Sequence, residues 1–159
     1  MALESTITAA IKAVETGAAD LAQPSAPAEL SVRHSFANGS GANQASKLFS
    51  DSRTLAASGS EDLDLAGVLA GALGGTITFA SVKAIMIRAK ATNANNVVVG
   101  PAASNGFLGP FGDAADRIAI RPGGVFLITA PAAGWAVTSG TGDLLAVANS
   151  GAGTPVDYD

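Results

Sequence analysis

From residue 29 onward, the sequence consists of short apolar runs separated by turn-forming residues, and this spacing constrains the fold most. The runs are rich in β-branched residues, and Gly, Asn, Asp and Pro lie between them. Runs of about four to eight residues with such boundaries are typical of strands, and none of these runs has a helical period. The pattern predicts an all-β domain, either a sandwich or a barrel.

The expected strands share a β-branched or alternating composition. In 82–88, Ile85 and Ile87 fall on one face, which favours a central position in a sheet. Asn93–Asn96 predicts a hairpin-like turn, and Arg121-Pro122-Gly123-Gly124 has the Pro and Gly positions of a type II turn. We expect 154–158 to be an edge strand. The other expected strands are 29–36, 44–49, 62–65, 76–79, 97–99, 118–120 and 125–129.

The glycine-rich segment Ser139-Gly140-Thr141-Gly142-Asp143 has the composition of a loop that could hold phosphate. A P-loop needs GxxxxGK followed by Ser or Thr, and a dinucleotide turn needs GxGxxG at the start of a helix. Neither spacing is present, and Leu144 and Leu145 follow instead. The segment predicts a five-residue turn between two strands that pair with each other, one around Trp135 and one around Val147.

The first 22 residues have a different pattern, which predicts an amphipathic helical arm over 1–22. Two prolines then predict a linker over 23–28, and the β-sandwich domain is expected over 29–159. An isolated helix of this length is marginal in water, so it must dock on its own domain, on another copy or on a partner. The residues that return to one helical face are Leu3, Ile7, Ala10, Ile11, Val14, Ala18 and Leu21.

The charge and composition argue against several classes of protein. Charged residues are only 14% of the chain, the net charge is −4, and the nine Lys and Arg residues are scattered. Such a chain lacks the basic stripe that binds nucleic acid, and its weakly charged surface suits packing against neighbours. No apolar stretch has the length of a membrane span or a secretion signal, so we expect a soluble chain. No cysteine is present.

Residues able to carry chemistry are few. The single histidine, His34, shares a strand face with Val32 and Phe36, which favours a structural role because no second histidine or cysteine could join it in a metal site. No serine stands in Gly-x-Ser-x-Gly, although several neighbour glycines. Among them are Ser40, Ser58, Ser60 and Ser139. We expect no catalytic or cofactor-binding residue and no enzyme activity.

Carboxylates form two groups, Glu61, Asp62 and Asp64, and Asp113 with Asp116. Asp62 and Asp64 fall on one strand face and could offer oxygen ligands to calcium, but the spacing of an EF-hand is missing. A solvated strand face or turn is the preferred interpretation, with no metal. A carboxylate pair of the glycosidase type would also have to come from these residues, and the sequence cannot give the separation that this mechanism needs.

A series of turns and strand faces from about Asp51 onward resembles a known group of proteins. These residues are similar to small virion structural proteins of tailed bacteriophages, of the head decoration or cement type. The resemblance implies a jelly-roll-like antiparallel β-sandwich present in many copies on a capsid, often as trimers, with no enzymatic residues. The motifs are Asp51-Ser-Arg-Thr-Leu55, Asp62-Leu-Asp-Leu-Ala-Gly67, Thr76 to Ile85, Arg121-Pro-Gly-Gly124, Gly134-Trp-Ala-Val-Thr, Gly140-Thr-Gly-Asp143 and Ala148-Asn-Ser-Gly151.

We therefore expect the chain to be a decoration protein that binds the outer surface of a phage head and stabilises contacts between major capsid protein subunits. The expected partners are the major capsid protein and copies of the chain itself, without nucleic acid or membrane, and the expected location is the virion. A fibre or receptor-binding protein that contacts the host surface is the first alternative. A small enzyme or ion-dependent module that uses Asp62 and Asp64 is the second.

Overall fold

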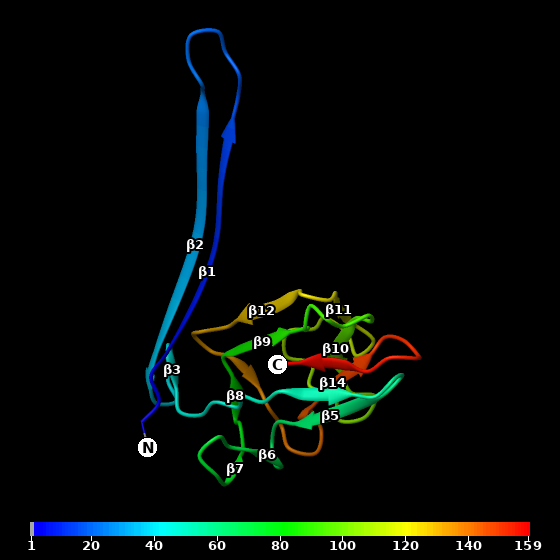
Figure 1. The fold of residues 1–159 in the computed structure, drawn as a ribbon. Helices are drawn as coiled ribbons and strands as arrows, with labels where there is room; N and C mark the ends of the chain where they lie inside the picture. The colour runs from blue at the N-terminus through cyan, green and yellow to red at the C-terminus, as the bar shows by residue number, and fades with distance from the viewer. Residues whose placement is uncertain (1) are drawn as a thin grey trace. The chain divides into compact units, whose positions relative to one another are not determined.

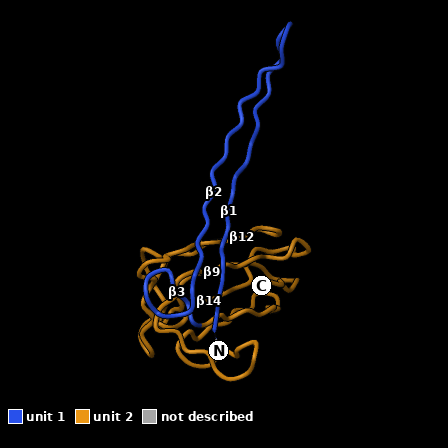
Figure 2. The backbone as a smooth tube through the Cα atoms, turned by 90° about the vertical axis from the view of Figure 1, so that its left-hand side faces the viewer, with its two compact units in different colours: residues 1–46 blue, residues 47–159 orange. Residues whose placement is uncertain are grey.

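The computed structural model describes residues 2–159 and divides into two compact units on either side of the Ser46–Lys47 bond (Figure 2). Strands, turns and loops make up both units, and no helix occurs among these residues. The prediction of an all-β chain is therefore confirmed. Nothing in this part of the chain is a helix that could cross a membrane. Each unit is described by itself below.

The first unit is a long antiparallel hairpin. All twelve residues of β1 (Ser5–Thr16) pair with β2 (Ser25–Asn38), and the two strands run side by side along their length (Figure 1). The amide of Gly17 donates to the carbonyl of Pro24 at 3.0 Å and closes the loop between the strands. A short strand, β3 (Gln44–Ala45), pairs in parallel with the end of β2.

The predicted N-terminal helix over 1–22 is wrong, because most of this segment forms β1. Ile7 and Ile11 are four residues apart, a spacing that fits a helical turn but equally fits one face of a strand. Ala9 and Ala13 lie on the same strand face, and the intervening positions carry Thr and Lys side chains. β2 supplies a cross-strand partner for every residue of β1, and such pairing overrides weak helical preference.

The predicted linker and domain boundary are also corrected by the structure. Ser25–Ala28, at the end of the expected linker 23–28, are the first residues of β2. Pro27 is compatible with this strand because a two-stranded ribbon has only edge strands, where proline is tolerated. The boundary between the units lies at residue 46, so the first part of the expected domain 29–159 belongs to the hairpin.

The second unit contains twelve short strands. They are β4 (Arg53–Leu55), β5 (Ser60–Asp64), β6 (Leu69–Ala70), β7 (Thr76–Ile77), β8 (Ser81–Val82), β9 (Ala84–Arg88), β10 (Val97–Pro101), β11 (Ile118–Ile120), β12 (Val125–Thr129), β13 (Trp135–Ala136), β14 (Leu144–Asn149) and β15 (Val156–Tyr158). Each strand overlaps or adjoins a run expected from the sequence, except β4, β6 and part of β8.

Two sets of strands dominate this unit. One is a four-stranded antiparallel sheet in the order β11-β10-β14-β5. In the other, β12 pairs with β9 and β15 pairs with β4. Ala89 forms a bridge with Tyr158, and Arg88 and Asp159 exchange backbone hydrogen bonds of 2.9 and 3.0 Å. β15 therefore lies between β4 and the end of β9, and its prediction as an edge strand is wrong.

Strand pairing differs from the local hairpins that the sequence suggests. β13 pairs with β8, and β14 pairs with β10 and β5, so the two strands that flank Ser139–Asp143 are not partners. Similarly, β9 pairs with β12 and not with β10, which follows the Asn93–Asn96 turn. The turn at Arg121–Gly124 is present as expected. Gly123 has a φ of 77°, and the amide of Gly124 donates to the carbonyl of Arg121 at 2.8 Å.

The hydrophobic core of the second unit takes side chains from both sets of strands. The alternation in β14 and β10 turns Val97, Val99, Leu145 and Val147 inward, and Ile87 and Tyr158 come from the other set. Phe107, which lies outside any strand, is fully buried in the same cluster. Close packing around a ring of this size makes its removal costly.

We expect Phe107→Ala to lower the free energy of unfolding of the second unit by about 3–5 kcal/mol, because it leaves a cavity in the core. Urea unfolding followed by the fluorescence of Trp135, the only tryptophan, measures this change. Leu108→Ala is the matched control, since the neighbouring Leu108 is 48% exposed and its truncation should cost less than about 1 kcal/mol. Equal losses for the two variants would contradict the placement of the core.

Candidate functional site

The most connected group of polar side chains lies around Glu61 in the second unit. The phenol of Tyr158 donates a hydrogen bond of 2.7 Å to Glu61 Oε1, and the Arg53 guanidinium donates to Glu61 Oε2. Arg53 Nε also lies 3.2 Å from Asp51 Oδ2, and the guanidinium carbon lies 5.9 Å from the centre of the Phe49 ring. Strands β4, β5 and β15 supply the three central residues, so this group links the two sets of strands.

Burial and the Glu61 carboxylate both act on Tyr158. Burial disfavours the phenolate, and the hydrogen bond to Glu61 disfavours it further, so the pKa of Tyr158 lies well above its ordinary value of 10.0. The phenol therefore stays protonated at neutral pH and serves as a donor. This hydrogen bond joins β15 to β5, so the phenol has a structural role. We call the group of Arg53, Glu61 and Tyr158 the Glu61 clamp.

A second group surrounds the side chain of Asp159. Ser52 Oγ donates to Asp159 Oδ1 at 2.6 Å, and Arg88 Nε donates to Oδ2 at 2.9 Å. Lys90 Nζ lies 2.7 Å from Oδ2. The hydrogen bonds from Lys90, Ser52 and Arg88 hold the pKa of the Asp159 carboxyl well below its usual range. Both cations thus have an acidic partner within the chain.

An open groove of about 660 Å³ runs beside the Asp159 group. Apolar and charged side chains share its lining, since Met86 and Val125 lie on the same face of the β9–β12 pair as Arg88. The complete lining is Ser50, Asp51, Ser52, Met86, Arg88, Lys90, Val125 and Asp159. In this lining the Ser52 hydroxyl is hydrogen-bonded to the Asp159 carboxylate, which is itself ion-paired with Arg88 and Lys90.

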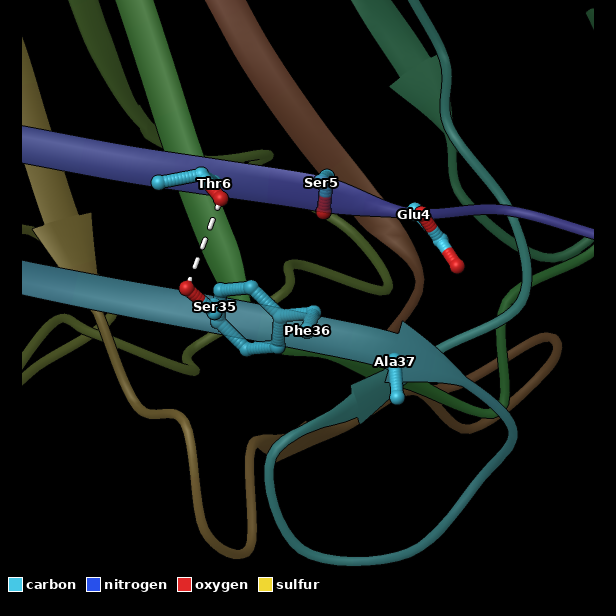
Figure 3. A pocket seen from close by; sticks show the side chains of 6 residues that line it. All are labelled: Glu4, Ser5, Thr6, Ser35, Phe36 and Ala37. Carbon is cyan, nitrogen blue, oxygen red and sulfur yellow. Dashed lines mark hydrogen bonds between the residues drawn. The ribbon is translucent and has the colours of Figure 1, made fainter.

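The hairpin has a smaller hollow of about 340 Å³ (Figure 3). Glu4, Ser5 and Thr6 line it from one strand side, and Ser35, Phe36 and Ala37 from the other. The hydroxyls of Thr6 and Ser35 lie 3.4 Å apart. Glu4 is the only ionisable side chain in this lining, so the hollow lacks a second acid or base to cooperate in proton transfer.

The structure places His34, the single histidine, on β2 in the first unit. Its ring is half-buried, with its centroid 6.5 Å from that of Phe36 and the planes tilted by 54°. This contact agrees with the predicted shared face of His34 and Phe36. The ring lies beside that of Phe36, and among residues 2–159 no hydrogen bond joins it to a carboxylate.

Of the carboxylates expected from the sequence, Asp62 and Asp64 lie on β5 as predicted, with Asp62 exposed. Asp64 Oδ1 accepts a hydrogen bond of 2.9 Å from the amide of Ala66, which caps the following turn. Between residues 2 and 159, no group of three or more potential metal-ligating side chains occurs.

Asp113 and Asp116 stabilise a surface turn. Asp116 Oδ2 accepts hydrogen bonds from the amides of Gly112 and Asp113, each at 2.9 Å. Asp113 Oδ1 accepts a hydrogen bond of 2.9 Å from the amide of Ala115. These bonds use the carboxylates to satisfy backbone donors, as Asp commonly does in turns. The second acidic group of the sequence is thus a structural element of the loop.

The glycine-rich segment Ser139–Asp143 is a tight turn, as predicted from its spacing. Thr138 bridges Gly142, and the amide of Gly142 donates to the carbonyl of Thr138 at 2.8 Å. Asp143 is buried, and its Oδ2 accepts the amide of Gly140 at 2.7 Å. An internal carboxylate therefore takes the backbone donor that a phosphate would need.

The four serines singled out in the sequence lie in turns, in loops or at the start of a strand. Ser60 begins β5, and Ser58 occupies the preceding turn with a φ of 54°. Ser40 and Ser139 lie in loops, and neither has a side-chain hydrogen bond to histidine or carboxylate in the part of the chain that the structure describes.

Sequence reasoning missed the Glu61 clamp and the Asp159 group. Glu61 is two residues before Leu63, so strand alternation places both side chains on the same, inward face. A carboxylate on an apolar face needs a partner, and this signal could have pointed to Arg53 or Tyr158. The pairing of Asp159 with Arg88 and Lys90 depends on β15 lying beside β9, which no local pattern indicates.

No protein family, curated protein or solved structure was found that matches this chain.

The raised pKa of Tyr158 predicts how stability depends on pH. The protonated phenol is favoured in the folded state, so its contribution is fully present below about pH 10 and is lost as the pH rises further. Because Tyr158 is the only tyrosine, absorbance at alkaline pH should show phenolate appearing only as the second unit unfolds.

The matched variant is Tyr158→Phe, which removes the titration and should make the free energy of unfolding flatter between about pH 10 and 12. At neutral pH the variant should lose about 1 kcal/mol with the hydrogen bond to Glu61. Phenolate that forms near pH 10 while Trp135 fluorescence stays native would show that the clamp is absent.

Proposed function

We propose that the chain is a decoration or cement protein of a tailed-bacteriophage head. In this function it binds the outer surface of the capsid and stabilises contacts between major capsid protein subunits. The proposal combines the resemblance of the motifs from Asp51 onward with three features of the structure, namely its strand arrangement, an apolar outward sheet face and the use of its charged side chains.

The strand arrangement supports a jelly-roll-like β-sandwich. Two sets of four antiparallel strands, β11-β10-β14-β5 and β12-β9-β15-β4, contribute side chains to one core cluster. Neighbours within each set are mostly distant in sequence, as in Greek-key and jelly-roll connections. A rigid sandwich of this kind can present extended faces and loops to a shell while its interior remains constant.

The outward face of the β9–β12 pair carries the functional proposal. In this pair Ile85, Ile87 and Phe126 pack in or against the core, whereas Met86 with Leu127 and Arg88 with Val125 form the opposite face. Met86 is 66% exposed and Val125 is 56% exposed. Outward positions of a half-solvated sheet are normally polar. An apolar outward face beside the Asp159 groove is typical of a surface that another protein covers.

The charged side chains support the same function. Glu61, Asp64, Asp116 and Asp143 accept hydrogen bonds within the second unit, and Asp159 is ion-paired with Arg88 and Lys90. The surface left for a partner is therefore weakly charged. Interfaces are depleted in charged residues at their centres, so this surface suits shape-complementary packing on a repeated shell.

The proposed partners are the major capsid protein and further copies of the chain. The resemblance implies trimers, and a symmetric oligomer would match the local symmetry of a capsid lattice. The location that follows is the capsid surface of the virion. No enzymatic step is part of this function.

The test is to mix the purified chain with capsids that lack it, and to measure both binding and the temperature at which the shells rupture. We expect saturable binding and a higher rupture temperature, because a ligand that binds only the intact shell stabilises it by mass action. Absence of saturable binding would overturn the proposal. Binding to host cell-surface glycans would then favour a fibre or receptor-binding protein.

A variant of the outward face locates the contact. We expect Met86→Asp to weaken capsid binding by about tenfold or more, because it places a charge in an apolar interface. Val68→Asp is the matched control, since Val68 is 73% exposed near β6 and away from the β9–β12 pair. Equal affinity of both variants would show that the β9–β12 face does not contact the capsid.

A further inference from the structure

The hairpin of the first unit has two chemically different faces. In the register of β1 and β2, paired residues share a face, and successive pairs alternate between the two. The face we call the apolar face contains Ser5, Ile7, Ala9, Ile11, Ala13 and Glu15 of β1, with Ala26, Ala28, Leu30, Val32, His34 and Phe36 of β2. The polar face contains Thr6, Thr8, Ala10, Lys12, Val14 and Thr16, with Ser25, Pro27, Glu29, Ser31, Arg33 and Ser35.

Most of the apolar face is uncovered. Ile11 is 69% exposed, Leu30 is 66% exposed and Val32 is 45% exposed. Ile11 and Leu30 are directly paired, so together they form one exposed apolar ridge across the ribbon. A two-stranded hairpin is marginally stable in water unless its apolar face packs on something else. The length and regular pairing of this hairpin therefore require a cover for the face.

We propose that the cover is the same face of a second copy of this chain. The middle of the apolar face has no charge, because Lys12 and Arg33 both lie on the polar face and Lys12 pairs with Glu29 at 3.1 Å. Two copies can thus meet over this region without bringing like charges together. A nucleic acid or an anionic membrane would instead need cations on the face that makes contact.

The shape of the face also fits a second copy. Next to the Ile11–Leu30 ridge lie Ala13 with Ala28 on one side and Ala9 with Val32 on the other. The small alanine side chains leave hollows beside a ridge of two large ones. An identical face that is shifted by one cross-strand pair can place its ridge in such a hollow, which is the interdigitation that packed sheets show.

The edges of the hairpin also carry unpaired backbone groups. β1 has no partner along its outer edge, and β2 has β3 only at Ala37 and Asn38, among the strands of residues 2–159. Open strand edges pair readily with further strands. This interface goes beyond the proposed binding to capsids, and it is tested with the chain alone.

The first experiment is sedimentation velocity of the full chain over a wide range of concentrations. We expect reversible oligomers, and we expect Ile11→Thr to weaken their association by about tenfold or more, because burial of a large aliphatic side chain is lost. Val14→Thr is the matched control. Val14 is 64% exposed on the same strand but on the polar face, so its replacement should leave association unchanged.

The absence of cysteine allows a second measurement that does not depend on the stability of a variant. Ala9→Cys places a thiol on the apolar face, and Ala10→Cys places one on the polar face. A short bis-maleimide should join chains of the first variant and leave those of the second mostly as monomers. Unchanged Trp135 fluorescence in each variant will show that the second unit is folded.

Three results would overturn the proposal. The chain could remain monomeric at every concentration, Ile11→Thr and Val14→Thr could have equal effects, or the two cysteine variants could cross-link equally. Monomers that bind vesicles of neutral phosphatidylcholine through Ile11 would identify a lipid surface as the cover. Monomers that bind capsids through Ile11 would identify the shell instead.

Discussion

The second unit depends on the insertion of β15 between β4 and β9. Backbone hydrogen bonds join this strand to both neighbours, and the phenol of Tyr158 reaches Glu61 on β5 in the other set of strands. Asp159, directly after the strand, holds Arg88 and Lys90. One short strand and the residue after it therefore connect two sets of strands and pair with the cations Arg88 and Lys90. Val156 and Tyr158 of this strand also belong to the core cluster.

The hairpin of the first unit shows the opposite situation. Its strands are long, and β2 supplies a partner for every residue of β1, but the middle of its apolar face is exposed. The two units thus differ in how far they bury their apolar side chains. In the second unit a compact core takes up Val97, Val99 and Val147, whereas in the first unit Ile11 and Leu30 remain exposed.

The sequence was sufficient to predict the all-β class and most strand positions, because β-branched runs and turn residues act locally. The type II turn at Arg121–Gly124 and the tight turn at Ser139–Asp143 were predictable for the same reason. The helix over 1–22 was wrong because Ile7 and Ile11 fit two periods, and the presence of β2 decided between them. Strand partners were the weakest predictions, since β13 and β14 each pair with strands distant in sequence.

The candidate sites also divide into those that depend on local sequence and those that depend on long-range pairing. The turn-capping acids lay where the acidic residues suggested, whereas the Glu61 clamp depended on long-range pairing.

The position of β15 has a consequence for the order in which the chain folds. Thr54 on β4 bonds to Asp157, 103 residues later, so this pairing must wait until almost all of the second unit has been synthesised. Contacts of such long range carry a large loop-closure entropy and slow the folding transition. The hairpin needs only the residues up to Asn38, so its strands can zip together while the ribosome is still translating the second unit. During synthesis, a ribbon with an open apolar face therefore precedes the compact unit, and nascent chains on neighbouring ribosomes could meet through it before either has finished folding.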